Sequence, residues 1–167
     1  ITGAMYDDVD NMPPGLVINK NNEIKSLNFN SGIEGNFYMQ PNGVFYINKQ
    51  DVGVVESNSF SNNNSYFAIQ SGPMLIENSQ IPSVVNPASV NKRKRCAVGV
   101  SGMGQNKVVY FVCSNNDVSF YDMASLFHDK YNCSDALHLE SGVFPFIYWP
   151  GSNMRSKENI MNYIVIR

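Results

Sequence analysis

The stretch that decides the fold runs from residue 68 to residue 78 and reads AIQSGPMLIEN. Apolar residues typical of buried strands flank a polar bend made of Gln70, Ser71, Gly72 and Pro73. A tight turn between two strands is the commoner interpretation of such a bend. Because both flanks are apolar, the sequence also allows a polar bend inside the core, where it would form the floor of a binding site.

The composition is that of an ordinary folded domain. The chain has 167 residues, of which 43% are hydrophobic and 16% are charged, enough apolar material for one core. The net charge of −2 gives no general attraction to nucleic acid, and we interpret the basic run at residues 92–95 as a solvated approach to a strand. No apolar run nears the roughly 18 residues of a membrane helix. We therefore expect neither a nucleic-acid partner nor a membrane span.

Cysteines and histidines are too few to predict a metal site. Cys96, Cys113 and Cys133 allow at most one disulfide and form no CxxC pair, and His128 and His138 are the only histidines. We expect no metal and no cofactor. His138 alternates with leucines on a predicted strand, which favours a buried, hydrogen-bonded histidine over a catalytic one.

Most local signals indicate antiparallel β structure. Residues 15–18 and 23–25 flank an asparagine-rich turn, and residues 36–39 and 44–47 flank Gln-Pro-Asn-Gly, so that each pair predicts a hairpin. Residues 56–65 are rich in Ser and Asn and predict a loop. Further strands are predicted at residues 53–55, 66–70, 74–76, 96–100 and 108–113.

One helix stands out. Apolar residues at 120, 123, 124 and 127 follow helical spacing, and Ser119 with Asp122 has the form of a capping box that begins the helix. A strand at 136–139 then ends at Glu140, an acidic residue well placed to face a cleft. We expect an α+β fold, with a twisted, mostly antiparallel β-sheet core and a few packed helices, in a single domain over residues 1–167.

The order of these motifs resembles the phosphodiester glycosidase family over nearly the whole chain. The motifs are GAMYD at 3–7, GLVI at 15–18, QSGPML at 70–75, RCAVGV at 95–100, FYDMASLF at 120–127 and DALHLESG at 135–142. Domains of this family normally begin some tens of residues earlier, so we expect the first strands to be absent or to belong to another chain. The resemblance favours an extracytoplasmic location, although the compartment stays open.

The resemblance implies hydrolysis of a sugar 1-phosphodiester, in which water replaces the phosphodiester at the anomeric carbon and a carboxylate stabilises the oxocarbenium-like state. The substrate would be a sugar phosphodiester or a glycan. The implied site consists of catalytic Glu140 and Asp7 with substrate-binding Tyr6, Gln70, Ser71, Gly72 and Arg95. Arg95 is the best candidate for the phosphate because its planar guanidinium can grip two oxygens, although it could equally bond a carbonyl or a surface acid.

Departures from the family pattern leave the activity open. Thr2 stands where Asn is usual, and Leu139-Glu140-Ser141-Gly142 matches a Leu-Asp-Gly-Gly signature with a carboxylate one methylene longer. Misplacing a catalytic oxygen by about 1 Å can cost about 10²-fold in rate. Three alternatives remain: a hydrolase, a catalytically impaired carbohydrate- or phosphate-binding module of the same fold, and a fragment with no activity alone.

Overall fold

The structure is a computed structural model that describes residues 13–141 and 164–165. Thr2, Tyr6, Asp7 and Gly142, to which we assigned a role from the sequence, lie outside the described residues.

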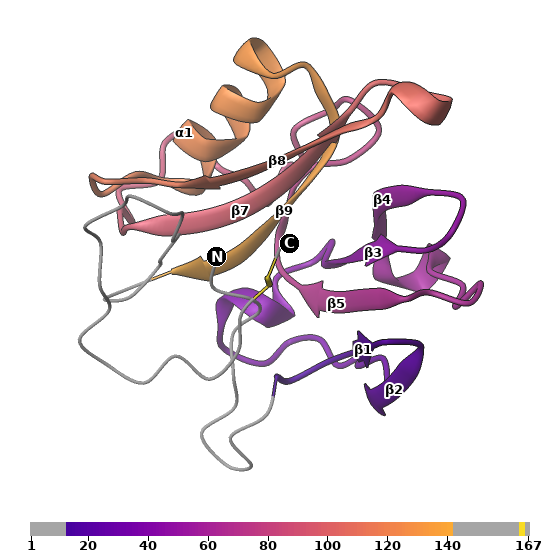
Figure 1. Ribbon diagram of the computed structural model, residues 1–167. Coiled ribbons are helices and arrows are strands. Elements are labelled where there is room, and N and C mark those ends of the chain that lie inside the picture. The colour runs from indigo at the N-terminus through magenta and orange to yellow at the C-terminus, as the bar shows by residue number, and fades with distance from the viewer. Residues whose placement is uncertain (1–12, 142–163, 166–167) are drawn as a thin grey trace.

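Nine described strands form two antiparallel sheets (Figure 1). The first sheet has the order β2-β1-β5-β3-β4 and the second the order β6-β9-β7-β8. The first consists of β1 (Val17–Asn19), β2 (Asn22–Lys25), β3 (Gly43–Ile47), β4 (Val52–Glu56) and β5 (Phe67–Ser71). The second consists of β6 (Met74–Ile76), β7 (Arg95–Ser101), β8 (Val108–Cys113) and β9 (Cys133–Ser141).

The predicted helix is present and starts where the sequence indicated. Helix α1 (Phe120–Ser125) continues into a π-helical turn, η4 (Leu126–Lys130). Ser119 Oγ accepts the amide of Asp122 at 3.0 Å, and the Asp122 carboxylate accepts the amide of Ser119 at 2.8 Å. This reciprocal capping box satisfies two amide groups that have no partner inside the helix. Short 3₁₀ turns form at η1 (Asn36–Tyr38), η2 (Ser57–Ser59) and η3 (Gly104–Asn106).

The elements stack in three layers, with the second sheet between the helix and the first sheet (Figure 1). One apolar cluster joins the sheets and includes Phe45 and Ile69 from the first sheet with Val98 and Leu137 from the second. A second cluster joins the middle sheet to the helix through Phe127 and its neighbours. β7 and β9 are therefore buried on both faces, and their ends are well placed to hold polar groups rigidly.

One predicted hairpin is confirmed and the other is wrong. Between β1 and β2, Lys20 and Asn21 have φ of 51° and 63°, the two positive values that a tight type I′ turn requires. Residues 36–39 do not form a strand, because Asn36–Tyr38 form the 3₁₀ turn η1. This turn places the side chain of Phe37 in the interior. Asn42 does not turn a hairpin, because its side chain donates to the carbonyl of Phe37 and its carbonyl accepts the amide of Ser57. β3 pairs with β4 and β5 instead.

The expected fold class is confirmed in its main part. The core is mostly antiparallel β structure, as predicted, but it consists of two sheets instead of one. The expectation of a few packed helices is corrected, because the described residues hold one helix, from Phe120 to Lys130, besides single 3₁₀ turns. The fold is thus more β than α+β. No helix in the described part of the chain has the length and apolar character to cross a bilayer.

Candidate active site at the end of strand β9

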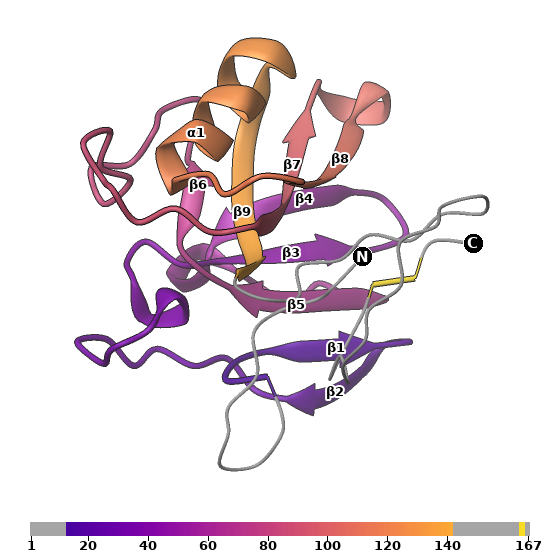
Figure 2. The same ribbon diagram turned by 90° about the vertical axis from the view of Figure 1, so that its left-hand side faces the viewer.

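The polar bend at residues 70–73 is the link between the two sheets. Ser71 ends β5 of the first sheet, and Met74 begins β6 of the second. Figure 2 shows the end of β9 reaching β5 at this point, where Ser71 Oγ donates to the carbonyl of Leu139 at 3.2 Å. The bend is therefore buried between flanking strands, and it brings the candidate residues of both sheets to one region.

Gln70 is fully buried, and its side chain holds two segments of the first sheet together. Its carbonyl oxygen accepts the amides of Leu16 and Asn28, at 3.1 and 2.9 Å. Its amide nitrogen donates to the carbonyl of Asn28 at 2.8 Å and to Ser57 Oγ at 3.0 Å. These bonds use all four hydrogen-bonding positions of a glutamine side chain. A direct sugar contact by Gln70 would require one of them to break.

Gly72 permits a close approach between protein segments. A Cβ atom at this position would lie 2.8 Å from the carbonyl oxygen of Phe37 and 2.9 Å from Cβ of Asn42. No larger residue fits without moving the backbone. The carbonyl of Gly72 faces the other side of the bend, where it lies 2.9 Å from Nδ1 of His138.

Strand register determines which candidate side chains share a face. Arg95 pairs with Ser141 across β7 and β9, and Cys96 pairs with Glu140. Paired residues point to the same side of a sheet and neighbours along a strand to opposite sides. Arg95 and Ser141 thus lie together on the face covered by the helix. The side chain of Glu140, at the same end of β9, points to the opposite face of the sheet.

Arg95 is only 1% exposed and is bound by the protein itself. Its guanidinium donates to the carbonyls of Val118 and Asn91, at 2.8 and 3.0 Å, and to Ser141 Oγ at 2.6 Å. Its central carbon lies 3.8 Å from the centre of the Phe120 ring. Burial, with a smaller effect of Arg93, lowers the pKa of Arg95 to about 10, so the side chain remains a cation at neutral pH. Three of its five N–H groups are engaged in this way.

His138 and Ser141 form a hydrogen-bonded relay with Arg95. A carbonyl can only accept, so Nδ1 of His138 carries the hydrogen donated to Gly72. Nε2 is then the acceptor for the hydroxyl of Ser141, 2.6 Å away, and Ser141 Oγ in turn accepts from Arg95. Burial is the main reason that the pKa of His138 falls to about 4, which keeps the ring neutral. The prediction of a buried, hydrogen-bonded histidine is confirmed.

Glu140 is the strongly perturbed carboxyl at this strand end. Burial raises its pKa from 4.5 to about 7, while the hydrogen bond from the Ser141 amide opposes the shift. That amide donates to Glu140 Oε1 at 2.7 Å and fixes the orientation of the carboxyl group. Because the pKa lies near neutrality, both the acid and the carboxylate are available at physiological pH, as general acid–base chemistry requires.

Ser141 is a site residue that was not predicted from the sequence. It entered only as the small residue after Glu140, and nothing in the sequence shows that its hydroxyl lies between a guanidinium and an imidazole. No sequence signal could have identified it, because the alternation of a regular strand would place residues 138 and 141 on opposite faces. Residues 138 and 141 can share a face only because the register shifts between Cys96 and Ala97.

A disulfide joins Cys96 and Cys113, which lie opposite each other on β7 and β8. Cys133 is a buried free thiol. The pairing agrees with the expectation of at most one disulfide, and it leaves Cys96 with no thiol for catalysis. Among the described residues, no group of three or more His, Cys, Asp or Glu side chains is arranged to hold a metal ion.

Fold and site together define a two-sheet antiparallel domain with a half-buried carboxyl of raised pKa at the end of a central strand. The chain belongs to the phosphodiester glycosidase family, whose sequence model matches residues 1–165. It is 35% identical over 152 residues to the Escherichia coli K12 protein YigE, described as uncharacterized, with 90% of this chain and 58% of YigE covered. The chain therefore spans little more than half the length of that relative.

A solved structure gives the same fold. The catalytic domain of zebrafish N-acetylglucosamine-1-phosphodiester alpha-N-acetylglucosaminidase, auto-inhibited by its pro-peptide, matches with a TM-score of 0.52. The match covers 84% of this chain and 50% of the zebrafish chain, at 16% sequence identity. At that identity the similarity concerns the fold alone.

Proposed function

We propose that this domain is a hydrolase that cleaves a glycosyl phosphodiester at the anomeric carbon, with Glu140 as its catalytic carboxyl group. The observation that carries the proposal is the position of Glu140 at the end of β9, with a pKa raised to about 7, in a chain of the phosphodiester glycosidase family. We further propose that residues 1–167 belong to one domain. The disulfide Cys96–Cys113 supports an extracytoplasmic location, since disulfides persist in oxidising compartments.

The chemistry requires little of a general acid. The bond between the anomeric carbon and the phosphate oxygen breaks, that oxygen leaves with the bonding electrons, and a water oxygen forms the new bond to carbon. A phosphodiester is a weakly basic leaving group, so protonating it matters less than for an alkyl glycoside. Glu140 as a carboxylate would stabilise the positive charge that develops on the sugar, and could take the proton of the attacking water.

Arg95 would supply positive charge for the phosphate in this proposal. Arg95 is only 1% exposed and lies on the sheet face opposite Glu140, so it would not touch the phosphate directly. Its charge would act through Ser141, to which it donates. Ser71 would contribute a hydroxyl to the substrate, and Gly72 and Gln70 would shape the floor beneath it. Tyr6 and Asp7 remain proposed members of the site.

The alternative is a carbohydrate- or phosphate-binding module of the same fold. The observation that favours this second function is Glu140 itself, whose carboxylate is one methylene longer than the aspartate of the Leu-Asp-Gly-Gly signature, a change that can lower turnover without lowering affinity. It predicts affinity for a sugar phosphodiester with no turnover.

The test is a hydrolysis assay on a panel of sugar 1-phosphodiesters that includes an N-acetylglucosamine 1-phosphodiester, with release of the free reducing sugar as the measurement. We expect Glu140→Gln to lower kcat by about 10²-fold or more and to leave KM nearly unchanged, because the amide retains size and the acceptor for Ser141 but not the charge. Glu34→Gln, at an exposed position, is the matched control. A wild-type protein that binds the panel without hydrolysing it would establish the binding module instead.

A further inference from the structure

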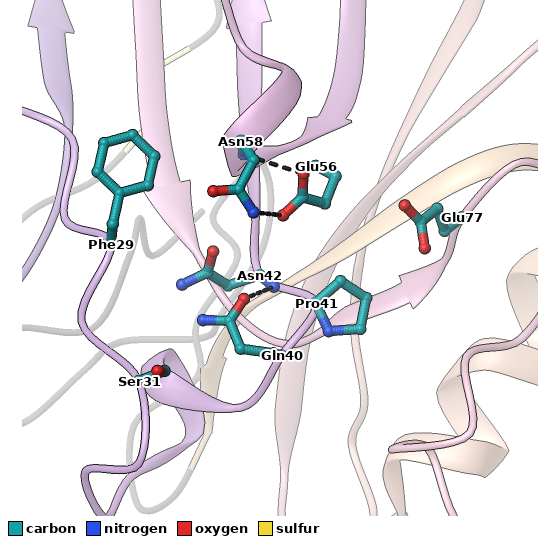
Figure 3. Close-up of a pocket in the computed structure, with 8 residues that line it drawn as sticks. All are labelled: Phe29, Ser31, Gln40, Pro41, Asn42, Glu56, Asn58 and Glu77. Carbon is teal, nitrogen blue, oxygen red and sulfur yellow. Dashed lines mark hydrogen bonds between the residues drawn. The ribbon is translucent and has the colours of Figure 1, made fainter.

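A hollow lies beside the polar bend of residues 70–73, where Asn42 packs against Gly72 (Figure 3). Its volume is about 540 Å³, within the range of small-molecule sites. The lining includes Gln40 and Asn42 before β3, Glu56 at the end of β4 with Asn58 after it, and Glu77 after β6. Segments from both sheets thus meet around it.

Several of the polar groups in this hollow are held in place. Asn42 is only 1% exposed, and its Nδ2 donates to the carbonyl of Phe37 at 3.2 Å. The two carboxylate oxygens of Glu56 accept from Asn58, one from the backbone amide at 2.9 Å and one from the side-chain amide at 2.6 Å. In Figure 3 these side chains and Gln40 gather around the same space. A preformed set of donors and acceptors costs less to order on binding than a flexible one.

The lining selects against phosphate. It contains two carboxylates, Glu56 and Glu77, and none of the described residues that line it is a lysine or an arginine. Phosphate groups are bound by cations and backbone amides, and a carboxylate repels them. The phosphoryl part of a substrate therefore does not belong here.

The same lining suits a hydroxyl-rich ligand. The exposed side-chain amides of Gln40 and Asn58 can each donate and accept, and the carboxylates accept from hydroxyl groups. Phe29, 58% exposed, offers an apolar ring at the edge of the hollow. A pyranose presents hydroxyl groups around its rim and C–H groups on its faces, and it matches both kinds of surface.

The hollow and the end of β9 share one piece of backbone. Asn42 packs on Gly72, and the carbonyl of Pro41 accepts the amide of Met74 at 2.8 Å. From the opposite side, His138 contacts the same segment through the Gly72 carbonyl at 2.9 Å. A ligand in the hollow would thus lie against the segment that also supports the relay of His138 and Ser141.

We propose that this hollow is a saccharide-binding site that takes an uncharged pyranose, such as a further sugar unit of a glycan substrate. Only the identification of that sugar as part of the substrate rests on the proposed function. Binding of a free sugar does not require turnover.

The experiment uses the whole chain and observes the side-chain amide signals of Gln40, Asn42 and Asn58 by NMR during titration with glucose and, separately, glucose 1-phosphate. We expect glucose to shift these signals and glucose 1-phosphate to bind there several-fold more weakly. Asn58→Ala should weaken glucose binding by about fivefold, the value of one lost hydrogen bond, whereas Asn116→Ala on an exposed turn should not.

Two results would overturn the assignment. One is a glucose titration that leaves the three amide signals unshifted, and the other is glucose 1-phosphate binding at these amides as tightly as glucose. Neither result depends on hydrolysis. Turnover without sugar binding in the hollow would contradict the saccharide site and leave the proposed hydrolase function intact. Sugar binding in the hollow without turnover would support the site and contradict the hydrolase function.

Discussion

Glu140 should make the stability of this protein depend on pH in a way that one substitution removes. Its pKa is 4.5 without the fold and about 7 within it. Because the folded protein holds the proton more tightly, this contribution to stability is fully present below the unfolded pKa and is lost as the pH rises through the folded pKa. At about 1.4 kcal/mol per pH unit, the shift corresponds to about 3 kcal/mol. The glutamine introduced by Glu140→Gln cannot titrate, so this variant should not lose that stability as the pH rises.

The assay is denaturant unfolding of the wild type and of Glu140→Gln at a series of pH values from about 4.5 to 8. The free energy of unfolding of the variant, minus that of the wild type, should rise by up to about 3 kcal/mol across this window. The pKa of His138 is lowered to about 4, so the free energy of unfolding decreases toward acid in both proteins. Because both proteins contain His138, this effect cancels in the difference. Glu34→Gln, at an exposed position, is the control. A flat difference for Glu140→Gln, or one that falls with pH, would refute the buried, protonated carboxyl.

Three further variants test the fold around the site. Ser119→Ala should lower the free energy of unfolding by about 1 kcal/mol through loss of the helix cap, and an unchanged urea midpoint would contradict the cap. Gly99→Ala places a Cβ atom 2.5 Å from the ring of Phe127 and should cost about 1–3 kcal/mol, so a neutral effect would mean that the helix can move. Replacing both Cys96 and Cys113 by Ala opens a loop of separation 17 and should cost about 3 kcal/mol, a loss that added reductant should reproduce in the wild type.

The sequence was informative where a local pattern has one structural meaning. The capping box of Ser119 and the apolar spacing after it could only begin a helix, and both are present as predicted. The Asn-rich turn after β1 likewise forms its hairpin. By contrast, the Asn-Gly pair at residues 42–43 indicated a hairpin that does not form. The side chain of Asn42 donates a hydrogen bond to the carbonyl of Phe37 instead. Long-range competition of this kind leaves no mark in a local pattern.

The candidate site shows the same division. Strand alternation correctly predicted that His138 is buried, because periodicity alone decides which face a residue occupies. The partners of Arg95 and Ser141 could not be predicted, because they depend on the pairing of β7 with β9 and on a register shift between them. A single sequence gives strand positions but not the register that brings residues 95 and 141 together.

That register also connects the two departures from the Leu-Asp-Gly-Gly pattern. A glycine at position 141 would keep the amide that holds Glu140 Oε1, but would leave Nε2 of a fully buried imidazole without the hydroxyl of Ser141, at a cost of about 1–3 kcal/mol. Arg95 would lose the same partner. Ser141 therefore anchors the strand end from which Glu140 projects, and the longer carboxylate is tied to its neighbour's amide instead of sampling many rotamers. The rate loss expected from one extra methylene assumes a carboxyl that is misplaced or free to move. A carboxyl fixed in this way favours the hydrolase over the impaired module.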